Sequence, residues 1–215
     1  MSIRNKLRSK AAFSMLELIL VIVILGFIAA LGLPRLENDP LREAADQLVR
    51  HIRYTQQLAM NDNKSDASQS VWYASNWQIW FRIFNGKYYY EIFSDVNQET
   101  NSNSSEEAKD PLTGKNLGNG DNGVGLPDNN DVNLTGKYNI TQMTFSANCK
   151  YGQGGKLAFD ALGRPYGDVS YSATQPFYKF LTTQCLITLQ HGSGRSADIT
   201  VIPETGYSFI SRIDP

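Results

Sequence analysis

Residues that usually carry enzyme chemistry are scarce in this chain, which has two histidines and two cysteines in 215 residues. His51 falls within a helical pattern and His191 within a turn, and neither has a partner at metal-ligand spacing. The sequence also lacks the nucleophile-elbow, zinc-protease, phosphate-loop and dinucleotide-binding motifs. We therefore expect a protein that is not an enzyme, that needs no cofactor and that carries both histidines on its surface.

Acidic residues are missing from the first twelve positions, which contain the basic residues Arg4, Lys6, Arg8 and Lys10. The whole chain has 20 basic and 21 acidic residues and a formal charge of −1. Without those four basic residues, the remainder would have 21 acidic residues against 20 minus 4 basic ones. Such a balance argues against general binding of nucleic acid, although a local basic patch remains compatible with it.

Charged residues are absent again from residues 18–33, and Glu17 is the sole charged residue of the apolar segment 13–33. About 20 apolar residues suffice for a helix to cross a bilayer. Insertion would tolerate Glu17, because one acid costs at most about 3 kcal/mol against the summed gain from the apolar residues. The preceding basic residues favour the cytoplasmic side, so the chain after Pro34 would lie across the membrane.

Two ordinary explanations of this segment leave Glu17 without a role. A plain single-span anchor has no need for an acid near its start. A cleaved secretory signal, cut after Gly32, fits the basic start and the small residues before the cut, but it would carry an acid at the head of its apolar core. Both explanations stay open alongside a third, which accounts for the acid.

The sequence AFSMLEL, followed by ILVIVILGFIAALGLP, resembles the N-terminal signature of type IV pilins and pseudopilins. The resemblance implies a leader peptide at residues 1–12, removed by prepilin peptidase between Ala12 and Phe13, and a methylated Phe13. It places Glu17 at the fifth mature position and Pro34 at the twenty-second, where the helix of this family kinks. The family usually has glycine before the cut, and this chain has Ala12 there.

The same resemblance implies that Glu17 acts in assembly. Cleavage would create an α-ammonium group on Phe13, and neither this charge nor the carboxylate is stable when unpaired in an apolar environment. In the family, this glutamate is thought to pair with the N-terminus of a neighbouring subunit. The implied partners are other pilins or pseudopilins, prepilin peptidase, the inner-membrane assembly platform and membrane lipid.

The expected location follows from the apolar segment and the resemblance together. Residues 13–33 would form a transmembrane helix that also lies in the filament core. The protein would cross the bacterial inner membrane once, keep its C-terminal domain in the periplasm and assemble into a periplasmic pseudopilus or pilus.

A helical period continues over residues 34–64, which predicts an amphipathic helix continuous with the first. Apolar or small residues recur there every three to four positions: Leu41, Ala45, Leu48, Ile52, Thr55 and Ala59. From residue 70 the period changes to two, and Asn85 and Gly86 separate two alternating runs as in a β-hairpin. Further strands are expected at 138–145, 156–160, 177–181, 184–190, 197–202 and 207–210. We therefore expect an α+β fold: a long N-terminal transmembrane and amphipathic helix packed on an antiparallel β-sheet domain at residues 65–215.

Three later segments, LREAADQLVRHIRYTQQLAMNDNK, LAFDALGRPYG and GSGRSADITVIPETGYSFI, resemble pilin-like proteins of the GspH/FimT group. This resemblance implies a structural minor pseudopilin of a type II secretion pseudopilus. The alternative is a minor type IV pilin or competence subunit that contacts DNA through closely spaced arginines. Gly194 and Arg195 match part of that motif, but the second arginine is missing, so we expect weak DNA binding or none. The candidate DNA contacts are Arg164, Lys179, Arg195 and Arg212.

Residues 94–137 are polar and have little apolar periodicity, so they predict a long insertion loop in the β domain. The loop contains Asp121, Asp128 and Asp131, and major pseudopilins are known for a calcium loop, but the spacing does not match an EF-hand. A solvated loop without metal is the favoured interpretation, with calcium binding as the alternative.

The two cysteines, Cys149 and Cys185, would lie in an exported domain. Disulfides form and persist in oxidising compartments outside the cytoplasm. We therefore expect the two to form a disulfide, with a pair of buried thiols as the alternative.

Overall fold

The computed structural model describes residues 14–32, 39–99, 101–120, 127, 129–168, 176 and 178–215. The chain divides into two compact units, Met1–Asn38 and Asp39–Pro215. The second unit combines helices with antiparallel sheets, so the expected α+β class is confirmed. Ala12, Phe13 and Pro34, which the pilin resemblance singled out, lie outside the described residues.

Helix α1 (Met15–Gly32) is the described part of the first unit. Its first turn is capped by Ser14, whose hydroxyl accepts a hydrogen bond from the Glu17 N–H at 3.2 Å. Glu17 itself lies in this turn, where a carboxylate is favoured by the positive end of the helix dipole. Local sequence alone therefore accounts for where α1 begins.

The expected single pass through the inner membrane, with the C-terminal domain in the periplasm, is wrong. Within the described ranges, none of the helices combines the length and the apolar character that a membrane crossing requires. A crossing helix needs about 20 predominantly apolar residues, whereas α1 contains 18 residues.

The expected continuous helix from residue 13 to 64 is also corrected, because a second helix begins independently. Helix α2 (Pro40–Asn61) starts after Asp39, whose backbone is extended at φ −102° and ψ 91°. The Asp39 carboxylate caps the new helix by accepting from the Arg42 N–H at 3.3 Å. Pro40 fits the first helical position, where its missing N–H is not needed.

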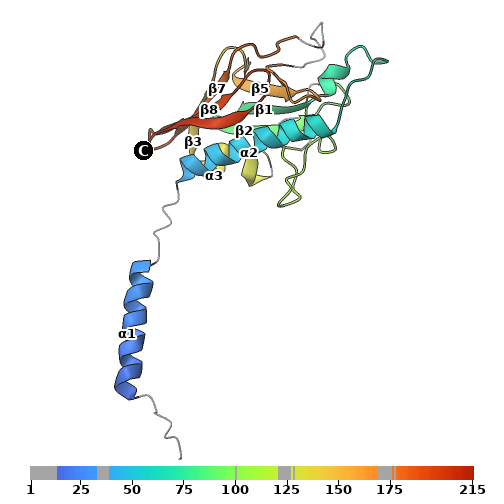
Figure 1. Ribbon diagram of the computed structural model, residues 1–215. Helices are drawn as coiled ribbons and strands as arrows, with labels where there is room; N and C mark the ends of the chain where they lie inside the picture. The colour runs from blue at the N-terminus through green and yellow to red at the C-terminus, as the bar shows by residue number, and fades with distance from the viewer. Residues whose placement is uncertain are drawn as a thin grey trace, which may run out of the picture. The chain divides into compact units, whose positions relative to one another are not determined.

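One face of α2 forms the centre of the core. The residues predicted to form its apolar stripe are all buried: Leu41, Ala45, Leu48, Ile52, Thr55 and Ala59. Figure 1 shows α2 lying along the sheets, and it contacts strands of both. The stripe therefore joins two sheets into one hydrophobic core.

Each of the two sheets is antiparallel. The first has the order β2-β1-β5-β4, with β6 pairing with β5. Its strands are β1 (Trp77–Phe84), β2 (Lys87–Ser94), β4 (Lys150–Tyr151), β5 (Gly154–Phe159) and β6 (Pro165–Tyr166). The second has the order β3-β7-β8-β9, formed by β3 (Ile140–Phe145), β7 (Cys185–His191), β8 (Ser196–Val201) and β9 (Ser208–Ile213). The short helices are η1 (Trp72–Ser75), η2 (Asn130–Val132) and α3 (Leu134–Tyr138).

The predicted hairpin between β1 and β2 is confirmed. Asn85 and Gly86 have positive φ angles of 49° and 72°, as a two-residue hairpin turn of the type I′ class requires. In contrast, the described part of residues 177–181 does not form the expected strand. Lys179 has a φ of 60°, which an extended strand does not allow, and Phe180 makes a single bridge to Tyr166.

The described part of the insertion at 94–137 is more ordered than its polar composition predicted. Ala108 and Leu117 are buried in the main core. The backbone of Ile92 in β2 accepts a hydrogen bond from the Ala108 N–H and donates one to the Leu117 carbonyl oxygen, both close to 2.8 Å. The insertion therefore packs against the first sheet through a few apolar residues that show no periodicity.

The expected disulfide between Cys149 and Cys185 is confirmed, with the two Cα atoms 5.7 Å apart. Both side chains are fully buried. The bond ties the start of β7 to the turn before β4, and so links the second sheet to the first.

Candidate functional site

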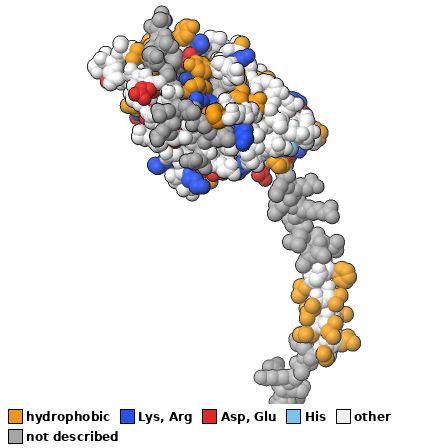
Figure 2. Space-filling model, turned by 180° about the vertical axis from the view of Figure 1, so that it is seen from behind, with side chains coloured by type: hydrophobic (Ala, Val, Ile, Leu, Met, Phe, Trp, Pro, Cys, Tyr) orange, Lys and Arg blue, Asp and Glu red, His pale blue; other side chains and the backbone are white. Residues whose placement is uncertain are grey.

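The surface of α1 is the first candidate site. Large apolar side chains are exposed at every position from 18 to 25, which covers more than two turns and therefore all sides of the helix. Figure 2 shows apolar side chains along the visible face of α1. Met15 and Phe27 are 82% and 66% exposed. Glu17 is exposed among them, and its carboxylate has no hydrogen bond or ion pair with any residue in the described ranges.

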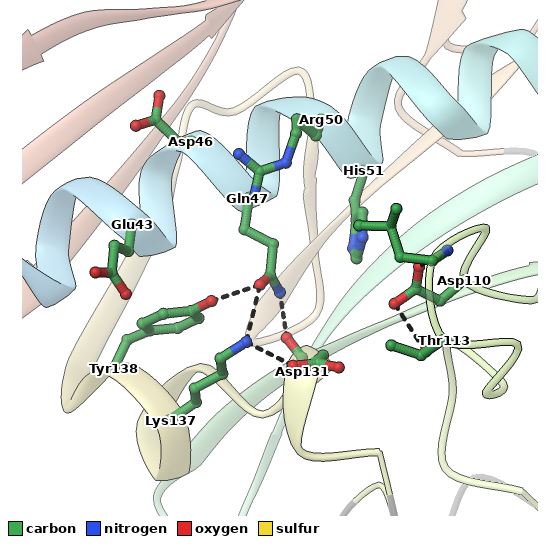
Figure 3. Close-up of a pocket in the computed structure, with 11 residues that line it drawn as sticks. Glu43, Asp46, Gln47, Arg50, His51, Asp110, Thr113, Asp131, Lys137 and Tyr138 are labelled. Atoms are coloured by element: carbon green, nitrogen blue, oxygen red, sulfur yellow. Dashed lines mark hydrogen bonds and ion pairs between the residues drawn. The ribbon is translucent and has the colours of Figure 1, made fainter.

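A groove beside α2 is the second candidate site (Figure 3). Its volume is about 420 Å³. One wall is α2, a second is the turn at residues 110–113, and the third is formed by η2 and α3. The lining is mostly charged or polar: Glu43, Asp46, Gln47, Arg50, His51, Asp110, Leu112, Thr113, Asp131, Lys137 and Tyr138.

Gln47 organises the floor of this groove. Its amide nitrogen donates to the Tyr90 hydroxyl at 2.9 Å and to the backbone oxygen of Asp131. Its amide oxygen accepts from the Tyr138 hydroxyl and from the Lys137 ammonium. Every polar atom of this buried side chain is therefore bonded, which fixes α3 and η2 against α2.

His51 lies next to this network and is not the solvated surface histidine that we expected. Its Nδ1 is 2.6 Å from the Tyr90 hydroxyl, and its ring meets the Tyr90 ring edge-on. Burial lowers the pKa of His51 from 6.5 to about 4, although the nearby Asp110 carboxylate opposes this shift. The imidazole is therefore neutral at pH 7. Burial also raises the pKa of Tyr90 well above its usual value.

The turn at residues 110–114 is held by Asp110. Its carboxylate accepts from the Leu112 N–H at 2.8 Å and from the Thr113 hydroxyl at 3.0 Å, while its carbonyl oxygen accepts from the Gly114 N–H. Burial acts to raise the pKa of Asp110, but these hydrogen bonds outweigh it and lower the pKa. The turn is thus well defined, and it presents the Leu112 side chain with 93% of its surface exposed.

The four residues proposed as DNA contacts all pair with carboxylates. Arg164 pairs with Asp160 at 2.6 Å, and Lys179 is 3.5 Å from Asp168. The other two, Arg195 and Arg212, both contact Asp214 near the C-terminus. Arg195 also pairs with Asp39, and Arg212 also pairs with Asp198. Their positive charges are therefore largely compensated within the protein.

Of the three aspartates considered for calcium, Asp121 and Asp128 lie outside the described residues. Asp131 is described, and its carboxylate pairs with Lys137 at 2.5 Å. Within the part of the chain that the structure describes, there is no group of three or more residues that could hold a metal ion.

A second buried polar cluster, on the first sheet, has no signal in the sequence. The Lys156 ammonium is 4.6 Å from the ring centre of Trp80 and 4.4 Å from that of Tyr151. Burial lowers the pKa of Lys156 to about 8 and raises that of Glu91, which pairs with Arg82 at 3.2 Å. The alternating pattern of the strands could predict that these residues lie on the same face of the sheet. It could not predict that other segments of the chain bury this face.

No family model matches this chain, and no significant match was found among the curated proteins or the solved structures. The geometry of the two candidate sites is therefore the basis on which a function can be assigned to this chain. One is an apolar helix exposed on all sides, and the other is a polar groove with an ordered floor.

Proposed function

We propose that this chain is a structural subunit of a pilus-like filament, specifically a minor pseudopilin of a type II secretion pseudopilus. It is cleaved by prepilin peptidase between Ala12 and Phe13, and it assembles through α1. Its partners are other pilins or pseudopilins, whose equivalent helices pack around α1. It performs no catalysis.

The observation that carries this proposal is the exposed apolar surface of α1. Burying one large apolar side chain stabilises a protein by about 1.5–3 kcal/mol, and α1 exposes such side chains on all sides. A sheet or a single helix can cover only one side of a helix. Several helices packed around it, as in the core of a filament, cover all sides at once.

Glu17 supplies specificity in such a core. Its carboxylate is exposed in the free chain, so it is readily solvated there. Inside a bundle of apolar helices the same carboxylate would require a cationic partner, because an unpaired buried charge costs several kcal/mol. The α-ammonium that cleavage creates on Phe13 of a neighbouring subunit is the partner we propose. This pairing would fix the axial position of one helix relative to the next.

The mature N-terminus tests the processing step. Protein purified from its native host should begin at Phe13 and carry one N-methyl group, as measured by intact mass and N-terminal sequencing. A start after Gly32 would instead indicate an ordinary secretory signal. A chain that retains Met1 would have no α-ammonium on Phe13. Either of these results contradicts the proposal.

The alternative function, a competence subunit that contacts DNA, has less support. Arg195 makes two hydrogen bonds to the Asp39 carboxylate, at 2.9 and 3.1 Å, and further ones to the backbone of Asp214. Binding a phosphate would require Arg195 to leave these partners. We expect no gel shift with duplex DNA at near-physiological salt. Micromolar binding that weakens with salt and is lost in Arg195→Ala would favour the alternative.

A further inference from the structure

A further cavity lies where the segment after α2, helix η1 and the turn between β5 and β6 meet. We call it the Trp72 pocket and define it by Asn63, Trp72, Asn76, Leu162 and Arg164, which line it. Its volume is about 290 Å³, near the lower end of the range for ligand pockets, which is roughly 300–1,000 Å³. A cavity of this size suits one ring better than an extended chain.

Asn76 is the residue that points to a polar ligand. It is only 6% exposed, yet its side-chain amide makes no hydrogen bond to any residue that the structure describes. Its backbone N–H, in contrast, donates to the Tyr73 carbonyl oxygen at 3.2 Å. Buried amides normally have partners, because leaving them without any is costly. A ligand that both donates and accepts hydrogen bonds would supply those that Asn76 lacks.

The pairing of strands brings Asn76 to the turn that forms another wall of the pocket. Gln78 of β1 pairs with Ala158 of β5. Continued by two residues past the strand ends, this register puts Asn76 across from Asp160. Because side chains alternate between the two faces of a sheet, both residues then lie on the same face as Gln78 and Ala158. The pocket is therefore formed at the end of an ordered sheet.

Trp72 gives the pocket an aromatic surface. It is the first residue of η1 and is partly exposed. Helix η1 is fixed to the end of β2, because the Ser75 hydroxyl donates to the Asp95 carbonyl oxygen and the Ser75 carbonyl oxygen accepts from the Ser94 hydroxyl. The indole N–H of Trp72 makes no hydrogen bond within the described ranges, so it is available to a ligand. Leu162, which is 72% exposed, adds an apolar side chain.

The charged groups of the pocket compensate each other. One oxygen of the Asp160 carboxylate accepts from the Arg164 Nε at 2.7 Å and from the Tyr166 hydroxyl at 3.0 Å. The other accepts from the backbone N–H groups of Leu162 and Arg164. Among the described lining residues, Asp160 and Arg164 are the only charged ones. The pocket is therefore neutral overall and favours a neutral ligand.

We propose that the Trp72 pocket binds one neutral pyranose ring of a saccharide. The C–H face of the ring packs on the indole of Trp72. The sugar hydroxyls, which both donate and accept, bond with the amide of Asn76. An extended peptide is a poorer fit, because peptides bind along grooves or sheet edges. This interaction is independent of α1 and of filament assembly.

The test uses the full chain, labelled with ¹⁵N and kept in solution by a polyoxyethylene detergent, which has no sugar head group. The chain has three tryptophans and so three indole N–H signals, and Trp72→Phe identifies the one from Trp72. The ligands are the methyl glycosides of glucose, galactose, mannose and N-acetylglucosamine. We expect at least one of them to shift the signals of the Trp72 indole and the Asn76 amide, with a Kd in the millimolar range. The indole signals of Trp77 and Trp80 should not move.

Matched variants locate the interaction. Trp72→Ala, followed through the Asn76 amide, should weaken the best glycoside about tenfold, because the aromatic contact is lost. Asn76→Ala, followed through the Trp72 indole, should weaken it about fivefold. Tyr207→Ala is the control, because Tyr207 is aromatic and 55% exposed but does not line the pocket. If Asn76→Ala fails to fold, Trp72→Ala at its partly exposed position still tests the site.

A tetrasaccharide of the best-binding sugar distinguishes the source of the ring. Tighter binding than that of the methyl glycoside would indicate a glycan chain, and weaker binding a free sugar. Three results would overturn the proposal. The first is that none of the four glycosides shifts the Trp72 indole. The second is that N-acetylalanine methylamide binds equally well, which would indicate a peptide group as the ligand. The third is that glucuronic acid binds at least tenfold more tightly than glucose, which would indicate an anion site at Arg164.

Discussion

Helices α1 and α2 are similar in length, with 18 and 22 residues, but their surfaces are opposite in character. In α2, apolar and small residues occupy one face, and that face is buried against the two sheets. In α1, apolar residues occupy every face, and they are exposed. The apolar face of an amphipathic helix can be buried within one chain, because a single partner surface covers it. A helix that is apolar all round needs partners on every side.

The largest effect that we expect lies wholly within the second unit. Removing the disulfide in a Cys149→Ala, Cys185→Ala variant should lower the free energy of unfolding by about 4 kcal/mol, because the bond closes a loop across a sequence separation of 36 residues. Urea denaturation followed by tryptophan fluorescence measures this loss. An unchanged unfolding midpoint, with thiol labelling confirming the oxidised state of the reference protein, would contradict it.

The next prediction contrasts one leucine from each helix. Leu48→Ala in α2 should lower the free energy of unfolding by about 3 kcal/mol, because Leu48 is fully buried. Leu20→Ala in α1 should leave the unfolding of the second unit unchanged, because the Leu20 side chain is 54% exposed. Urea denaturation of both variants measures the difference. Equal losses would mean that α1 contributes to the same core.

A third prediction concerns pH. His51 has a pKa of about 4 in the folded protein, against 6.5 for an unperturbed histidine. Between these values the unfolded chain binds the proton and the folded chain does not, so His51 makes stability fall as pH decreases from 6.5 to 4. The loss amounts to about 2–3 kcal/mol.

Urea denaturation at intervals between pH 4 and 7 gives this slope. In His51→Gln the slope over the same range should be reduced, since glutamine does not titrate and can still bond to Tyr90. A slope identical to that of the wild type would assign the pH dependence to other groups.

The smallest effect concerns the boundary at which α2 begins. Asp39→Ala should cost at least about 1 kcal/mol, because it removes the cap on the Arg42 N–H and also the hydrogen bonds from Arg195. Amide hydrogen exchange should then speed up in the first turn of α2. Asp46→Ala, which removes only a weak pair on the surface of the same helix, is the control and should change stability by less than about 0.5 kcal/mol. Equal exchange rates in the two variants would mean that α2 begins without help from Asp39.

Features that depend on neighbouring residues could be predicted from the sequence. The buried stripe of α2 follows from the spacing of its apolar residues, and the β1–β2 hairpin follows from Asn85 and Gly86. The disulfide was predicted because both cysteines fall in a domain that was expected to be exported, although nothing in the sequence could show that their Cα atoms lie 5.7 Å apart. Each of these features was predicted from a local sequence pattern or from a single possible pair of residues.

Features that depend on contacts between distant segments could not be predicted in this way. His51 lies on the half of α2 that looked solvated, but the 110–113 turn and the chain near Asp131 cover it. The sequence alone left Arg195 as a candidate DNA contact. In the structure it pairs with Asp39, which is distant in the sequence, at the start of the second unit. The groove beside α2 combines three such segments, so its charge balance has no counterpart in the sequence order.

Substitution of Glu17 tests the difference between the two helices most directly. We predict that Glu17→Leu is cleaved at Phe13 like the wild type but no longer crosslinks to partner pilins, whereas Glu17→Asp retains part of the crosslinking. The reason is that the α-ammonium of Phe13 would lose its partner in an apolar filament core, which costs several kcal/mol. The measurement is crosslinking between subunits in the native host, with leader cleavage followed in the same samples. Wild-type crosslinking by Glu17→Leu would contradict the account, because α1 would then assemble through its apolar surface alone.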